Sequence, residues 1–97
     1  MKTEKSKRLK GLLKIANEVE LCTLLQEVTT ELRNGRYRKV EVQHDVLDII
    51  AQHKPRVTKV TRDAYQGFVD VARAAASKNV VVVKKLKEFA ETNKLDF

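Results

Sequence analysis

Apolar residues recur at helical spacing through the first third of the chain. Residues 5–17 place apolar side chains three and four positions apart, and lysines fill positions between them. Residues 19–34 continue this spacing through Leu21, Leu24, Leu25, Val28 and Leu32. A stripe of this period predicts two amphipathic helices, the second ended by Asn34 and Gly35. The pattern leaves open whether the two segments form one long helix or bend near residues 16–19.

The middle and the end of the chain show shorter patterns that predict strands. Residues 37–42 alternate apolar and polar positions, as a half-buried strand does. Residues 80–83 are consecutive valines, and β-branched side chains favour a short buried strand. Residues 56–60 are predicted to be an extended connector or a brief strand.

Further helices are predicted in the second half of the chain. Residues 44–53 form a short helix that Pro55 ends, because the residue before a proline is pushed out of the α region. Residues 61–78 form a longer helix, with Thr61 as its cap and Asp63 near its positive end. Residues 84–93 return to helical spacing. We therefore predict a mainly α domain with short β-strands, an α+β fold.

The predicted order of elements matches a winged helix-turn-helix domain at the level of the fold alone. In that arrangement the helix over residues 61–78 is the reading helix. Two features depart from the pattern. The turn between His53 and Thr61 is longer than a tight helix-turn-helix link and lacks its glycine, and the residues after Val83 have helical rather than hairpin spacing.

Length and cysteine content define a broad class of protein. The 97 residues suit a single domain, residues 1–97, with residues 1–8 as a candidate flexible basic arm. Cys22 is the only cysteine, which rules out an internal disulfide and favours a reducing compartment. No apolar stretch fits a membrane span or a signal peptide. We expect a cytoplasmic protein without a membrane partner.

The formal net charge of +7 and the pI near 9.7 favour anionic partners such as nucleic acid. The basic residues fall into three blocks, with acidic residues between them. The N-terminal block contains Lys2, Lys5, Lys7, Arg8, Lys10 and Lys14. The middle block contains Arg33, Arg36, Arg38 and Lys39. The third block contains Lys54, Arg56, Lys59 and Arg62.

The third block lies at the start of the predicted 61–78 helix, where cations oppose the helix dipole. A bound phosphate would account for Lys59 and Arg62 there, with hydroxyl contacts from Thr58 and Thr61. The alternative is that these cations extend into water or pair with acidic neighbours. The outward positions of the same helix predict a stripe that reads base edges, which consists of Arg62, Gln66, Asp70, Arg73 and Ser77.

The lysine-rich N-terminal segment has three interpretations. As a flexible arm it would follow a phosphate backbone or enter a minor groove. As a basic amphipathic helix it would lie on an anionic membrane, which the absence of Trp and Phe in this segment disfavours. As a solvated helix face it would need no ligand.

The sequence offers few groups suited to catalysis or metal binding. His44 and Asp48 lie one helical turn apart and are interpreted as a surface pair, whereas His53 falls on another part of the helix, which argues against a shared metal site. Cys22 is interpreted as a buried structural thiol. The sequence shows no glycine-rich phosphate loop and no catalytic signature. We predict neither enzymatic activity nor a metal or cofactor.

Two classes of function fit these patterns. The first is a small basic DNA-binding protein, a regulator or accessory factor, that acts as a homodimer and contacts phosphates through the basic blocks. RNA binding through the same surface is not distinguished from it. The second is a helical protein-interaction module, such as an adaptor, inhibitor or immunity-type factor, that uses the leucine stripe of residues 21–32. Such a stripe is also typical of a domain's own core.

Overall fold

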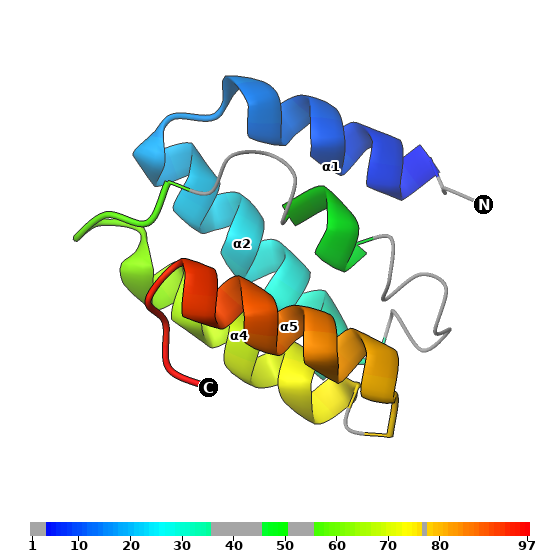
Figure 1. Cartoon of the computed structure of the whole chain (residues 1–97). Coiled ribbons are helices and arrows are strands. Elements are labelled where there is room, and N and C mark those ends of the chain that lie inside the picture. Colours follow the sequence, from blue (N-terminus) through cyan, green and yellow to red (C-terminus); the bar gives the residue numbers. More distant parts are fainter. Residues whose placement is uncertain (1–3, 36–45, 51–55, 77) are drawn as a thin grey trace.

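The computed structural model describes residues 4–35, 46–50, 56–76 and 78–97 (Figure 1). Its elements are the helices α1 (Glu4–Ile15), α2 (Glu18–Arg33), α4 (Arg62–Ala75) and α5 (Val80–Thr92), and residues 46–50 are also helical. The described residues contain no strand, so the α+β prediction is wrong and the winged helix-turn-helix analogy loses its basis. The strand predicted over residues 37–42 lies outside the described residues.

Helices α1 and α2 are separate because Asn17 caps the second one. The Asn17 side chain accepts a hydrogen bond from the Glu20 backbone N–H at 2.8 Å, and the Glu20 carboxylate accepts one from the Asn17 backbone N–H at 3.1 Å. This reciprocal capping box satisfies N–H groups that the first helical turn leaves without partners. The chain therefore bends where the sequence pattern was undecided.

The consecutive valines form the first turn of α5 rather than the predicted strand. Asn79 caps this helix, since its side chain accepts a hydrogen bond from the Val82 backbone N–H at 3.2 Å. Val82 is buried and begins an apolar helical row that continues with Leu86, Phe89 and Ala90. Burial of that row outweighs the helix propensity of valine, which is only about 0.6 kcal/mol per residue below that of alanine.

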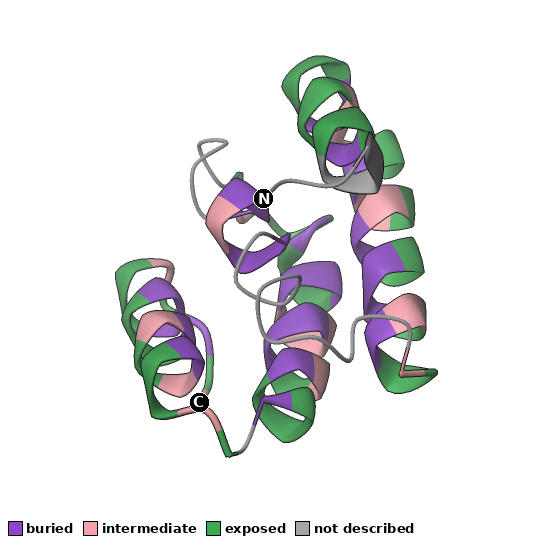
Figure 2. Cartoon of the chain, turned by 90° about the vertical axis from the view of Figure 1, so that its right-hand side faces the viewer, coloured by how far each residue is buried: buried purple, intermediate pink, exposed green. Residues whose placement is uncertain are grey.

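Helices α2 and α4 pack closely against each other at the centre of the molecule. Figure 2 shows α1 on the outer side of α2 and α5 on the far side of α4. The core draws on every helix, and its largest fully buried side chains include Tyr65, Phe68, Leu21 and Leu25. The leucine stripe of residues 21–32 is therefore mostly the domain's own core, with Leu24 only partly buried.

After α5, the chain reverses direction in a Schellman motif. Lys94 has a left-handed backbone with φ of 57°. The Leu95 N–H donates to the Ala90 carbonyl at 2.8 Å, and the Lys94 N–H donates to the Glu91 carbonyl at 3.3 Å. Leu95 then buries its side chain in the core. These contacts direct residues 95–97 back along α4 (Figure 1).

Candidate nucleic-acid interface

The outer surface of α1 carries a row of lysines that faces solvent. Lys7, Lys10 and Lys14 are all exposed, and they lie three and seven residues apart on one side of the helix. Leu9 and Leu13, on the opposite side, are buried. We call the three lysines the α1 basic face. The predicted N-terminal basic block is thus an ordered helix face from residue 7 onward.

The turn that precedes α4 is held against the junction of α1 and α2. The Arg56 guanidinium donates a hydrogen bond from Nη2 to the carbonyl oxygen of Ala16, which follows α1. The Cys22 thiol of α2 donates to the Val60 carbonyl oxygen at 3.4 Å. Lys59, in the same turn, is exposed. The fold therefore brings Arg56 and Lys59 of the third basic block beside the C-terminal end of the α1 basic face.

Carboxylates of the residues that the structure describes form no ion pair with this surface. Among the described residues the one ion pair joins Lys85 and Asp48, with Nζ and Oδ1 3.2 Å apart. Glu18 and Glu20 flank the α1–α2 junction, but the Glu20 carboxylate is engaged in the capping box. Lys7, Lys10 and Lys14 therefore remain available to an external anion.

The two threonines expected to contact phosphate are committed to the turn itself. Thr61 is fully buried, and its hydroxyl donates to the Arg56 carbonyl oxygen and accepts from the Thr58 backbone N–H at 2.9 Å. The Thr58 hydroxyl oxygen, at the surface, accepts from the backbone N–H groups of Val60 and Thr61. Thr61 is the N-cap residue of α4 as predicted, but its side chain makes no capping hydrogen bond. The N–H groups of Val60, Thr61 and Arg62 have partners in the protein, because all three donate to oxygen atoms of Thr58.

Tyr65 supports this turn from the core. Its side chain is fully buried, and its hydroxyl oxygen accepts a hydrogen bond from the Arg56 backbone N–H at 3.3 Å. Burial raises the pKa of Tyr65 above its usual value, while the hydrogen bond and the charge of Arg56 act in the opposite direction. The phenol therefore stays neutral at physiological pH and continues to support the backbone of residue 56.

The predicted base-reading stripe on α4 is occupied by the end of the chain. Arg62 donates from Nη1 to the Lys94 carbonyl oxygen at 2.8 Å, and Gln66 bonds to the backbone of Asp96. Arg73 donates to the Phe97 carbonyl oxygen, and its guanidinium lies 4.5 Å from the centroid of the Phe97 ring. These donors are engaged by the segment, although Arg62 and Arg73 stay partly open to solvent.

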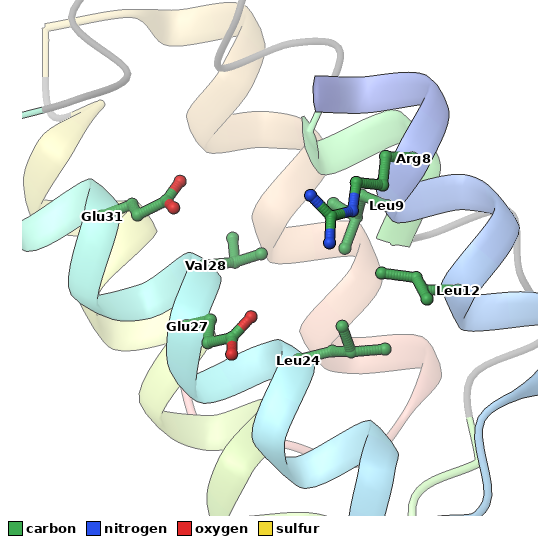
Figure 3. Close-up of a pocket in the computed structure, with 7 residues that line it drawn as sticks. All are labelled: Arg8, Leu9, Leu12, Leu24, Glu27, Val28 and Glu31. Carbon is green, nitrogen blue, oxygen red and sulfur yellow. The ribbon is translucent and has the colours of Figure 1, made fainter. Parts of the chain in front are cut away.

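Other predicted contact residues lie apart from this surface. Arg33 lies at the C-terminal end of α2, in a hollow shared with Asp63 and Gly67. Arg8 borders a hollow of about 190 Å³ between α1 and α2, with an apolar floor and Glu27 and Glu31 on its opposite rim (Figure 3). Lys5 belongs to α1, but the position of its side chain is not described. Outside the described residues lie the predicted contact residues Arg36, Arg38, Lys39, Lys54 and Ser77, and the two histidines His44 and His53.

A fourth basic segment was missed from sequence. Residues 71–87 contain no acidic residue, and their cations are Arg73, Lys78, Lys84, Lys85 and Lys87. The absence of acidic residues is visible in the sequence. The strand predicted over residues 80–83 divided this segment between two elements, so its cations were not grouped together. Lys84 and Lys87 are exposed on α5. Because α5 and α1 lie on opposite sides of the molecule (Figure 2), this segment does not extend the α1 basic face.

Comparisons with protein-family models, curated proteins and solved structures give no match to this chain. None of the described helices has the length and apolar character needed to cross a membrane. Among the described residues no cluster of His, Cys, Asp and Glu is arranged to hold a metal ion. Cys22 is only half-buried, rather than fully enclosed as expected.

Proposed function

We propose that this chain is a nucleic-acid-binding protein that contacts the phosphate backbone through one continuous surface. That surface, the corner surface, consists of Lys7, Lys10, Lys14, Arg56 and Lys59. The observation that carries the proposal is the hydrogen bond between Arg56 and the Ala16 carbonyl, because it brings two basic blocks distant in sequence to one edge of the fold. The exposed lysines of that edge have no carboxylate partner among the described residues.

Duplex DNA is the favoured form of the ligand. Single-strand binders usually stack bases on exposed aromatic rings. Among the described residues, Tyr65, Phe68 and Phe89 are buried and the Phe97 ring lies against Arg73, whereas Tyr37 lies outside the described residues. Lysine contacts to phosphate position a protein on a duplex without reading its sequence. We therefore propose an accessory factor that binds the DNA backbone.

Replacement of Lys7 and Lys10 by glutamine tests this proposal. Each phosphate contact that is lost removes about 0.9 from the slope of log affinity against log salt concentration. If both lysines contact phosphate, the slope for the double variant should be about two smaller than for the unchanged protein. The measurement is fluorescence anisotropy of a labelled duplex over a series of salt concentrations.

The matched control places the same change in net charge elsewhere. Gln26 and Thr30 are exposed on α2, away from the corner surface, and Gln26→Glu with Thr30→Glu lowers the net charge equally. This control should keep the original salt slope. Equal slopes for the two double variants would show that overall charge, rather than the corner surface, governs binding.

A further inference from the structure

The outer face of α4 is bound by the segment that follows α5. Arg62, Gln66 and Arg73 all donate hydrogen bonds to residues 94–97. We call these three side chains the α4 donor row. Gln66 makes the most specific contact, because its Nε2 donates to the Asp96 carbonyl at 2.8 Å and its Oε1 accepts from the Asp96 N–H at 2.8 Å.

The α4 donor row recognises oxygen atoms rather than particular side chains. All its acceptors within residues 94–97 are backbone carbonyl oxygens, which are neutral. Phosphate oxygens carry a negative charge, so a guanidinium group gains coulombic attraction and bidentate geometry with phosphate that a neutral carbonyl oxygen does not offer. The carbonyl oxygens therefore occupy positions that phosphate oxygens of a nucleic acid would fill more favourably.

The segment that follows α5 is attached most firmly at Leu95. Leu95 is anchored by its buried side chain and by its hydrogen bond to Ala90. Beyond it, Asp96 and Phe97 contact Gln66 and Arg73 on α4. Asp96 is exposed, whereas the Phe97 ring is partly buried against the core. Release of Asp96 and Phe97 therefore breaks these polar contacts and the partial packing of the Phe97 ring, and leaves the Leu95 anchor in place.

We propose that the α4 donor row is a second nucleic-acid contact surface, which Asp96 and Phe97 cover until a duplex displaces them. This inference rests on the proposed function. Arg62 follows Lys59 by three residues, so the row begins near that end of the corner surface and runs away from it along α4. The Asp70 carboxylate, which accepts a hydrogen bond from Gln66 Nε2 at 3.0 Å, stays on α4, so the two arginines of the row carry the phosphate contact.

Phe97→Ala tests this proposal because it weakens the cover without touching the donor row. The cation–π contact with Arg73 lies at the surface, and its loss should raise affinity for a duplex by about two- to fivefold. Phe97→Tyr keeps a ring over Arg73 and should bind as the unchanged protein does. In an Arg73→Ala background, Phe97→Ala should bring no gain, because the uncovered contact is missing.

Amide hydrogen exchange at Asp96 gives a second readout on the full chain. A saturating duplex should accelerate exchange of this amide, which loses its bond to Gln66, while the Leu95 amide stays protected. Two results would refute the covered surface while leaving the corner surface in place, provided that the unchanged protein binds duplex. The first is that Phe97→Ala gains no affinity. The second is that Phe97→Ala gains the same affinity in the Arg73→Ala background as in the unchanged protein. A protected Asp96 amide in the complex refutes the covered surface too. If no variant binds duplex even at low salt, the proposed function and this inference both fail.

Discussion

Arg56 and Tyr65 show how single residues fix the geometry of the corner surface. The Arg56 backbone N–H bonds to the buried Tyr65 hydroxyl, its carbonyl accepts from Thr61, and its side chain reaches Ala16. The residue is therefore held at three points, although its side chain is exposed. None of these contacts follows from the spacing of basic residues in the sequence, because each joins groups that only the tertiary fold brings together.

The raised pKa of Tyr65 predicts a loss of stability at alkaline pH. The folded state holds the phenol proton more tightly than the unfolded chain, whose pKa is about 10. The unfolding free energy should therefore fall as the pH rises above about 10, because the unfolded state then binds fewer protons. Tyr65→Phe removes this contribution, and at neutral pH it costs about 1 kcal/mol for the lost hydrogen bond.

Urea denaturation of both proteins between about pH 8 and 11 measures this difference. Lysines titrate in the same range in both, so the contrast between the two curves isolates the phenol. Parallel curves for the two proteins would show that Tyr65 titrates in the folded state as it does in the unfolded chain.

The elements show which sequence signals were decisive. Helical periodicity located α2 and most of α1, α4 and α5, and residues 46–50 are helical within the segment predicted as a short helix. The junction at Asn17 carried a readable signal, since Asn17 and Glu20 have capping-box spacing. The strand prediction for the valines of α5 was wrong because β-propensity reflects the packing of the side chain more than a preference of the backbone. In this chain Val82 packs into the core as part of a helical row that ends in Ala90.

Substitution of an exposed valine distinguishes a helix from a strand at residues 80–83. Val81 is 56% exposed on α5, so Val81→Ala should raise the unfolding free energy by roughly 0.5 kcal/mol through helix propensity alone. Val82 is 2% exposed, and Val82→Ala should lower it by about 2 kcal/mol because a cavity forms. Urea denaturation measures both. A Val81→Ala protein less stable than the original would favour the strand.

At the scale of the whole molecule, α1 is the outermost layer and packs on α2 through few residues. Leu9, Leu13 and Ala16 are nevertheless buried in the same core cluster as residues of α4 and α5. Sequence patterns predicted the buried face of each helix. They did not predict that the α4 stripe would face residues 94–97, since the reversal depends on a left-handed conformation at Lys94 that lysine rarely adopts.

Leu13→Ala tests whether α1 belongs to the cooperative unit. Leu13 is 2% exposed, so its truncation should cost about 2–5 kcal/mol. If α1 unfolds together with the core, circular dichroism and the fluorescence of Tyr65, measured in a Tyr37→Phe background, should show coincident, equally shifted transitions. A shift confined to the dichroism signal would mean that α1 detaches before the core unfolds.

The position of Arg56 has a consequence for mutational scanning. The Arg56 guanidinium bonds to the end of α1 and also contributes a positive charge to the corner surface, so the same side chain affects both the fold and the affinity for a ligand. Alanine at this site would lower apparent affinity even if Arg56 never touched a ligand, because the neighbouring turn would shift. A scan of the cations therefore ranks them correctly only when each binding constant is accompanied by a melting curve.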